Sequence, residues 1–290
     1  MGGWRGVAVV ALLGAGCGRG PFFRFPDQLV ERCSAVDFLF VIDNSESMAR
    51  HQDNLRANFE PFIDGIGESL DDVEDFHVGV VTTDAYRDNG EGCRELGALV
   101  TSVDAPGVQR RECGPFAEGE RYMTDEDDLT EAFNCAADVG TDGSRSEEPM
   151  KAMSRAINGT SWPWYRQCNG GFLRDDALLV SVIITDEADG EQTDNGTIQP
   201  GPEDWFDTVV SAKGTESNAV VVSLLNGVTP ECPVSDEAFD GTKIAEFTRS
   251  FTHGFVGGIC QPDYGAVFAR AVDEIDEACT TYTAELAIAP

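Results

Sequence analysis

The stretch that decides the fold is VDFLFVIDNSESM, which occupies residues 36–48. Residues 38–42 are continuously apolar, a pattern typical of a strand that is buried on both faces of a parallel sheet. The apolar run ends at Asp43, and two hydroxyl residues, Ser45 and Ser47, follow at alternate positions. Because residues two apart in an extended segment point the same way, we expect one carboxylate and two hydroxyls to converge above the end of this strand.

Apolar runs and helical patterns alternate along the rest of the chain. Further strands are predicted at 76–83, 97–103, 177–185 and 219–225, with an alternating edge strand at 282–288. Helices are predicted at 46–70, 125–139, 146–157, 203–213, 243–251 and 265–279. This alternation predicts an α/β fold with a mostly parallel central sheet flanked by helices. In such a sheet, ligands bind at the carboxyl ends of the strands, where the strand order reverses.

The composition suits one packed domain and narrows the classes of partner. Of the 290 residues, 41% are hydrophobic, so we predict a single domain over 35–290 with Cys-bearing loop insertions. Acidic residues number 52 and basic residues 20, for a formal net charge of −32. That balance argues against nucleic acid as a partner and against electrostatic adsorption to anionic lipid. It favours attraction of cations, although a solvated acidic surface accounts for most of the charge.

The N-terminus, MGGWRGVAVVALLGAGCGRG, has the layout of a secretory signal. Arg5 precedes an apolar run at 7–13 that is too short to span a bilayer, and small residues and Cys17 follow. The segment LLGAGC resembles a bacterial lipobox, in which Cys17 becomes the lipidated first residue; the alternative is an ordinary signal peptide that contains a cysteine. We predict a signal peptide at 1–16, a tether at 17–34, and an exported protein held in the bacterial cell envelope, at the outer membrane, periplasm or surface. Its only membrane contact would be the lipid.

The cysteine count supports export. Setting Cys17 aside leaves an even number of cysteines, which in an exported chain indicates disulfide bonds. The eight candidates are Cys33, Cys93, Cys113, Cys135, Cys168, Cys232, Cys260 and Cys279. No CxxC pair is present, so a thiolate zinc site is not expected. Three pairings are predicted: Cys93–Cys113, Cys232–Cys260 and Cys33–Cys279.

The spacing DNSES, read as D-x-S-x-S after a buried strand, resembles the metal-ion-dependent adhesion site of von Willebrand factor type A domains. That family has a threonine in a loop before a later helix, and VGTDGSRSEEPMKAM supplies Thr141 at such a place. The family also has an aspartate at the end of a later buried strand, and VIITDEADG supplies Asp186. The order of elements is similar over residues 37–225. The chain also resembles the exported, Cys-rich versions of this domain in bacterial lipoproteins.

The resemblance implies a fold, a cofactor and a partner. The fold would be the Rossmann-like von Willebrand factor type A fold, and the cofactor a divalent cation, Mg²⁺, Ca²⁺ or Mn²⁺. The implied metal-binding residues are Asp43, Ser45, Ser47, Thr141 and Asp186. An acidic side chain of a partner protein would fill the last coordination position, so the chain would be an adhesion module and not an enzyme. Two alternatives are a structural envelope protein whose metal stabilises the fold, and a metal-dependent hydrolase.

Each proposed ligand also has a simpler interpretation. Asp43 and the two serines could cap the following helix, since short polar side chains accept hydrogen bonds from backbone N–H groups at helix starts. Ser144 or Ser146 could take the place of Thr141. Asp186 could cap a helix or face solvent in a turn.

Two features of the sequence depart from the family pattern. Glu46 stands between the two serines, where a small residue is common, and Glu187 and Asp189 follow Asp186. We expect these acids to raise the affinity for Ca²⁺ and to lower the affinity for acidic ligands.

A hydrolase would need a base such as His51 beside the serines. The chain, however, has no G-x-S-x-G elbow, P-loop, or G-x-G-x-x-G after a strand.

Overall fold

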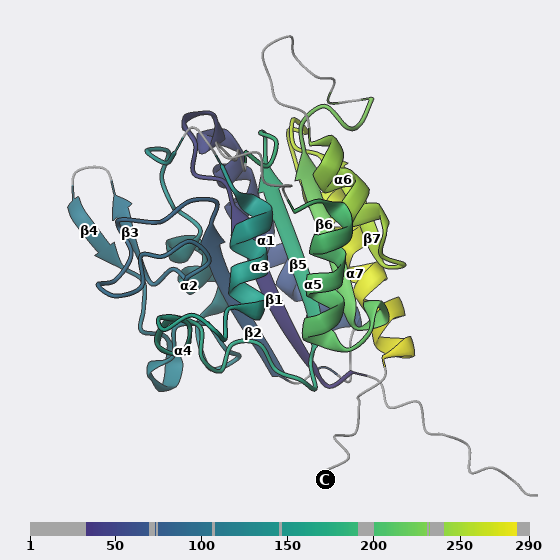
Figure 1. The fold of residues 1–290 in the computed structure, drawn as a ribbon, viewed down its shortest axis with the longest axis horizontal. Coiled ribbons are helices and arrows are strands. Elements are labelled where there is room, and N and C mark those ends of the chain that lie inside the picture. Colours follow the sequence, from purple (N-terminus) through teal and green to yellow (C-terminus); the bar gives the residue numbers. More distant parts are fainter. Residues whose placement is uncertain are drawn as a thin grey trace, which may run out of the picture.

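The apolar runs of the sequence form a five-stranded sheet in which every neighbouring pair of strands is parallel. Its strands are β1 (Ala35–Ile42), β2 (Asp75–Thr82), β5 (Leu178–Thr185), β6 (Ala219–Leu225) and β7 (Gly254–Gly258). They lie in the order β2-β1-β5-β6-β7 (Figure 1). All residues of β1 and β5 are buried, as their continuous apolar sequence predicts. The predicted α/β class with a parallel central sheet is therefore confirmed.

The computed structural model describes residues 33–69, 73, 75–105, 108–144, 147–190, 200–230, 232 and 241–282. The predicted signal peptide, Cys17 and nearly all of the tether lie outside these ranges. Ser146 and the predicted strand at 282–288, apart from its first residue, also lie outside them. No helix in the described ranges is long and apolar enough to cross a bilayer.

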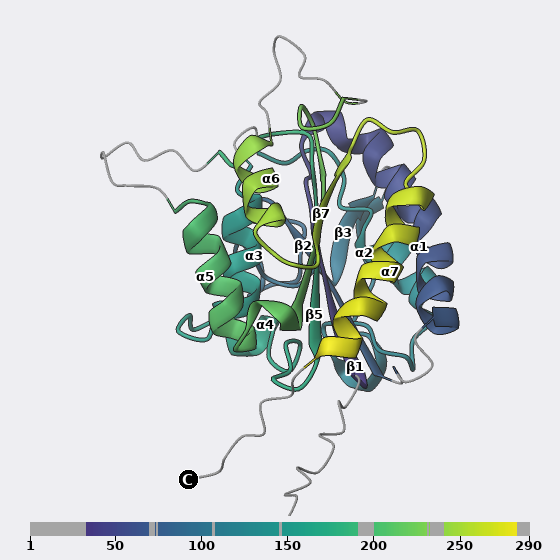
Figure 2. The ribbon, with the colours of Figure 1, turned by 90° about the vertical axis from the view of Figure 1, so that its right-hand side faces the viewer.

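Helices cover both faces of the sheet, which Figure 2 shows nearly edge-on. One layer contains α1 (Ala49–Ser69), α2 (Leu129–Ala136) and α7 (Gly265–Thr281). The other contains α3 (Pro149–Asn158), α4 (Tyr165–Cys168), α5 (Pro202–Lys213) and α6 (Thr242–Arg249). Single turns of 3₁₀-helix occur at Glu46–Met48, Ala117–Gly119 and Glu216–Asn218.

Alternate residues of β1 build two separate cores. Phe38 and Phe40 belong to the core that includes Phe59 and Phe62 of α1. Leu39 and Val41 belong to the core that contains the apolar faces of α3, α5 and α6. Successive side chains of a strand point to opposite faces, so one continuous apolar run supplies both cores.

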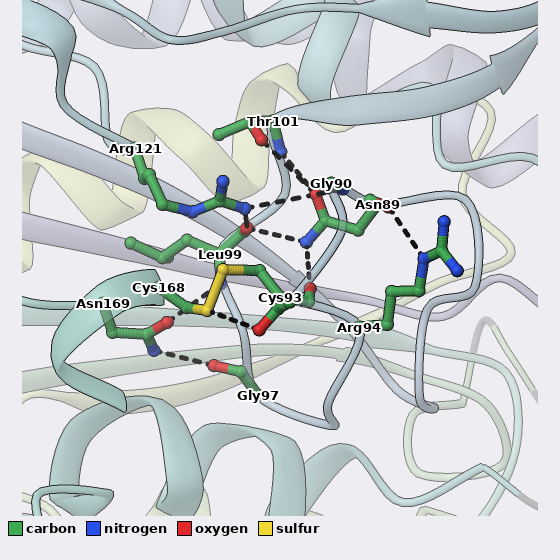
Figure 3. Close-up of a disulfide and its surroundings, with 11 residues drawn as sticks. Asn89, Gly90, Cys93, Arg94, Gly97, Leu99, Thr101, Arg121, Cys168 and Asn169 are labelled. Atoms are coloured by element: carbon green, nitrogen blue, oxygen red, sulfur yellow. Dashed lines mark hydrogen bonds between the residues drawn. A yellow bond between two sulfur atoms is a disulfide. The ribbon is translucent and has the colours of Figure 1, made fainter. Parts of the chain in front are cut away.

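The predicted strand at 97–103 is mostly wrong. The strand there, β3 (Ser102–Ala105), pairs with β4 (Val108–Glu112) in a separate antiparallel sheet beyond β2. Before β3, backbone groups form hydrogen bonds with the side chain of Asn89 and not with a neighbouring strand. Asn89 Nδ2 donates to Leu99 O (2.8 Å), and Thr101 N donates to Asn89 Oδ1 (3.0 Å). Figure 3 shows this arrangement. A buried side chain that satisfies these backbone groups removes the need for strand pairing.

Strand β7 is not among the predicted strands. Its sequence, GFVGG, contains three glycines, and glycine is depleted in strands. Gly257 lies close to its neighbours, because a Cβ atom there would be 3.0 Å from side-chain carbons of both Leu224 and Val267. The close packing of β6 and α7 against β7 therefore favours glycine at position 257, although glycine has a low β-strand propensity.

All eight predicted cysteines form disulfides, in four pairs. The pairs are Cys33–Cys279, Cys93–Cys168, Cys113–Cys135 and Cys232–Cys260. Two predicted pairings are confirmed, but the pairing of Cys93 with Cys113 is wrong. Cys93, in the loop after β2, bonds the last residue of α4, and Cys113, after β4, bonds α2 (Figure 3 shows the first of these). Four disulfides are typical of a chain that matures in an oxidising compartment.

Candidate functional site

The site lies where the strand order reverses. From β1 the chain continues to β2 on one side, and β5 pairs with β1 on the other. Asp43 directly follows β1, and Asp186 directly follows β5. The two strand ends are joined, because Asp43 N donates a hydrogen bond to Ile184 O at 3.0 Å. Both carboxylates therefore leave the sheet at the position where open parallel sheets bind their ligands.

Four of the five residues that the sequence implicates are brought together by hydrogen bonds. Ser45 Oγ and Ser47 Oγ lie 3.3 Å apart, and Ser47 Oγ donates to Asp186 Oδ1 at 3.1 Å. Ser45 N donates to Asp43 Oδ1 at 2.7 Å. Thr185, which sequence reasoning did not select, donates from Oγ1 to Asp43 Oδ2 at 2.6 Å. Both oxygens of the buried Asp43 carboxylate are thus held in place.

These contacts do not support the interpretation that Asp43, Ser45 and Ser47 cap the following helix. Ser45 is the N-cap of the 3₁₀ turn Glu46–Met48, yet its side chain makes no capping hydrogen bond. Asp43 accepts from the N–H of Ser45, which precedes that turn. The polar atoms therefore face one another and not the helix start.

Thr141 lies on the loop after α2, and this loop packs against the end of β1. It is half-buried and lines a hollow together with Ser45, Ser47 and Glu187. Gln52 of α1 holds this loop, because its Nε2 donates both to Asp43 O (2.9 Å) and to a loop carbonyl at residue 140 (2.8 Å). Among the described residues, no hydrogen bond joins Thr141 to the other four predicted ligands.

Asp84, just beyond β2, also positions the loop. Its Oδ1 accepts from Asn44 Nδ2 at 3.2 Å, and its Oδ2 accepts from Ser144 N at 2.8 Å. Gly143 N donates to Asn44 O at 2.9 Å. Asn44 thus connects the D-x-S-x-S turn to the loop that carries Thr141 and Ser144.

Glu147 is a buried acid at this site that sequence reasoning assigned only to a helix start. Its side chain is fully buried, and Thr83 Oγ1 donates to its Oε2. Among the described residues, none forms a hydrogen bond with its Oε1. Burial, with the nearby Asp43 carboxylate, raises the pKa of Glu147 to about 8. The sequence signal that could have identified it is a glutamate pair, of which only Glu148 lies at the N-cap of α3.

The other carboxyl groups at the strand ends are perturbed for the same reason. Burial raises the pKa of Asp43 to about 6, against the lowering effect of its hydrogen bond from Thr185. Burial raises the pKa of Glu187 to about 7, with the charges of Asp43 and Asp186 adding to the effect. None of the ion pairs in the described part of the chain involves any of these groups. Among the described residues, the carboxyl groups of this site therefore have no ion-pair partner of opposite charge.

His51 does not serve the serines as a base in this arrangement. Its Nδ1 lies 3.0 Å from Tyr264 Oη, which itself donates to Ile259 O at 2.8 Å. Burial also lowers the pKa of His51. The imidazole is therefore engaged with α7 and the chain before it, and not with Ser45 or Ser47.

A second group of metal-type ligands lies beside β7, the edge strand of the sheet. His253, which directly precedes β7, and Glu274 and Glu277 of α7 place ligand atoms within 4.8 Å of one another. Arg270 lies 3.3 Å from Glu274, and Glu277 is exposed. Because Arg270 already supplies a positive charge, Arg270 and Glu274 form a surface ion pair within this group.

Comparisons with known proteins leave the family open. No family model and no curated protein matches the chain. Among solved structures, proximal thread matrix protein 1 from the mussel byssus is 10% identical with a TM-score of 0.42, over 84% of this chain and 49% of that one. A von Willebrand factor type A protein from Catenulispora acidiphila is 14% identical with a TM-score of 0.42, over 86% of this chain and 43% of that one. This chain thus spans less than half the length of either, and likeness at this level assigns neither family nor function.

Proposed function

We propose that this protein is an exported binding module of the von Willebrand factor type A kind, which engages a partner protein through a divalent cation. The observation that carries the proposal is the chain of contacts from Ser45 through Ser47 to Asp186 at the reversal of strand order. Hydroxyl and carboxylate oxygens are the ligands that Mg²⁺, Ca²⁺ and Mn²⁺ prefer. Asp43 and Thr141 would complete the set that the protein supplies.

The arrangement suits a cation that also binds an outside group. Asp43 is buried, but Ser47 is exposed and Asp186 is half-buried, so the outer side of the site faces solvent. Neutral hydroxyl ligands leave a cation electron-poor, so it gains from an incoming carboxylate. An acidic side chain of a partner protein is the group we propose for the open position.

The proposed location is the bacterial cell envelope, with Cys17 as the lipid-anchored residue. The four disulfides support an oxidising compartment outside the cytoplasm. The signal-like N-terminal sequence supports export, and the lipobox-like LLGAGC supports the anchor. The partner would then be a protein of the envelope or of a neighbouring surface.

A structural role for the metal is the second candidate, and one observation favours it. Asp43 and Glu147 are fully buried. A cation there would offset the cost of burying these carboxylates, and would stabilise the fold even without a partner. We do not propose an enzyme, because His51 contacts Tyr264 and not the serines.

An affinity pull-down from envelope extract, with and without chelator, tests the proposal. The bait variants are wild type, Ser45→Ala/Ser47→Ala and the control Ser211→Ala, whose serine is exposed on α5. We expect capture of a partner by wild type and the control only with the cation present, and no capture by the double variant. Calorimetric titration with Mg²⁺, Ca²⁺ and Mn²⁺ measures the affinity for each ion and so identifies the cation that the protein binds. A chelator that lowers the melting temperature without changing what is captured would favour the structural role.

A further inference from the structure

His253 is a buried histidine whose ring lacks a hydrogen bond at Nδ1. The residue directly precedes β7 and is only 4% exposed. Within the described ranges, no group forms a hydrogen bond with its Nδ1, and Oε2 of Glu274 lies 3.5 Å from that atom. Native structures rarely keep a buried polar atom without a partner, so the ring nitrogen and the carboxylate it faces need a group between them.

The group between these two atoms must carry a positive charge, because an imidazole lone pair and a carboxylate oxygen repel each other. It is either a proton on Nδ1 or a metal ion. A charge-assisted hydrogen bond through a proton would be about 2.7–2.9 Å long, which is shorter than the distance from His253 to Glu274. Two ligands of a tetrahedral ion with bonds of about 2.1 Å lie about 3.4 Å apart. The observed 3.5 Å therefore fits two ligands of one ion.

Glu277 adds a third ligand on the same side of α7. It lies three positions after Glu274, so the two side chains are neighbours on one face of the helix. The ligand atoms of His253 and both glutamates all lie within 4.8 Å of one another. Glu277 is exposed, and it takes part in none of the ion pairs in the described part of the chain. Its side chain can therefore make the small rotation that closes the set around an ion.

The other two ligands are held in position by their surroundings. His253 O accepts a hydrogen bond from Val221 N of β6 at 3.1 Å. Arg270 Nη2 donates to Glu274 Oε1 at 3.3 Å, and the guanidinium carbon of Arg270 lies 4.3 Å from the centre of the Phe255 ring on β7. Arg270 thus occupies one oxygen of Glu274 and leaves Oε2 facing His253. Hydrogen bonds of this kind commonly orient the carboxylate ligands of metal ions.

We propose that His253, Glu274 and Glu277 form a second metal site, which binds Zn²⁺. Imidazole nitrogen together with carboxylate oxygen suits Zn²⁺, whereas Mg²⁺ and Ca²⁺ prefer oxygen ligands alone. Three protein ligands leave a fourth position for water or for a group from outside. The strand-end site contains no nitrogen ligand, so this inference does not depend on the proposed function.

The ion would join α7 to the edge strand of the sheet. His253 belongs to the segment that enters β7, and the two glutamates lie in the second half of α7. Cys279, two positions after Glu277, already bonds Cys33 before β1. The metal would add a second connection, from the same helix to the opposite end of the strand order. Because a ligand that binds only the folded state stabilises it, Zn²⁺ should raise the melting temperature.

Calorimetric titration of Zn²⁺ tests the proposal, in excess Mg²⁺ that occupies any oxygen-only site. The proteins are wild type, Glu277→Gln and the matched control Glu60→Gln, which makes the same change at an exposed residue of α1. We expect wild type and the control to bind Zn²⁺ alike, and Glu277→Gln to bind it at least about tenfold more weakly. Glu277 is exposed, so its substitution leaves the core intact. Equal affinities for the two variants would overturn the proposal.

Nitrogen NMR of the histidine rings identifies the ligand atom without any substitution. The chain has only three histidines, so their ring signals can be assigned. We expect Zn²⁺ to shift the Nδ1 signal of His253 and to leave those of His51 and His77 in place. A proton that stays on Nδ1 of His253 at saturating Zn²⁺ would show that the group is an ion pair only. Ser45→Ala/Ser47→Ala should bind Zn²⁺ as wild type does, because the two sites are separate.

Discussion

The hydroxyl of Ser47 donates a hydrogen bond to Oδ1 of Asp186 across 3.1 Å, although 139 positions of the chain separate the two residues. The contact joins the turn after β1 to the end of β5, which lie side by side in the sheet. A hydroxyl and a carboxylate that already face each other need little rearrangement to bind one cation, so the cost of ordering the ligands is largely met by folding.

We predict that Asp186→Asn lowers the affinity for the cation by about tenfold or more, because it removes one charge from the ligands while keeping the size of the side chain. The fold should be unaffected, since Asp186 is only half-buried. Calorimetric titration measures the affinity, and the control is Asp142→Asn, at an exposed residue that lines the hollow beside Ser45 and Ser47. Equal affinities for the two variants would remove Asp186 from the site.

We predict that Cys93→Ala/Cys168→Ala destabilises the protein more than Cys113→Ala/Cys135→Ala does. The first disulfide joins residues 75 positions apart and the second residues 22 apart. In the chain-entropy account, the longer loop makes the first bond worth roughly 1 kcal/mol more. Urea unfolding of the two variants measures the difference. A larger loss for the Cys113–Cys135 pair would show that local contacts, not loop entropy, dominate.

We predict that Asn89→Ala lowers the free energy of unfolding by about 3 kcal/mol or more, because it leaves several buried backbone groups unsatisfied. The fully buried side chain donates to Cys93 O (2.7 Å) and Leu99 O (2.8 Å) and accepts from Gly90 N and Thr101 N (Figure 3). Denaturant unfolding measures the loss.

The control for Asn89 is Asn158→Ala, at the exposed end of α3, which should change stability by no more than about 0.5 kcal/mol. Similar values for the two variants would contradict the role given to Asn89.

We predict that Asp37→Ala lowers the free energy of unfolding by about 1–3 kcal/mol, because it leaves the N–H of Arg174 without its acceptor, whereas the guanidinium keeps its ion pair with Asp75 at 2.6 Å. Asp37 is fully buried; its Oδ1 lies 2.7 Å from Arg174 Nη2, and its Oδ2 accepts from Arg174 N at 2.7 Å. Denaturant unfolding, with Asp175→Ala at the exposed neighbouring position as control, measures the effect. If both variants unfold alike, the ion pair is not a significant contributor.

Local pattern predicted most of the strands and the centre of the site. A strand buried on both faces must be apolar throughout, so β1 and β5 are recognisable from their own residues alone. In a parallel sheet the carboxyl ends lie at one edge, so the position of Asp43 and Asp186 directly after these strands predicts that they lie near each other. Neither inference needs the packing of any helix.

Contacts between distant segments explain the parts that were wrong or missed. The segment before β3 was predicted as strand, but the side chain of Asn89 satisfies its backbone. Cys93 was paired with a nearby cysteine, but the folded chain places it against α4. These outcomes depend on which segments are neighbours in space, which no local pattern records.

By itself, the sequence determined that a parallel sheet forms and that a carboxylate and two hydroxyls follow its first strand, because burial and strand periodicity act over a few residues. Only the tertiary structure decided that Ser47 reaches Asp186, that Thr185 holds Asp43, and that Glu147 is buried beside them. Packing around the ends of β1, β2 and β5 sets the burial and the contacts of these groups, and this environment exists only when the three strands lie side by side.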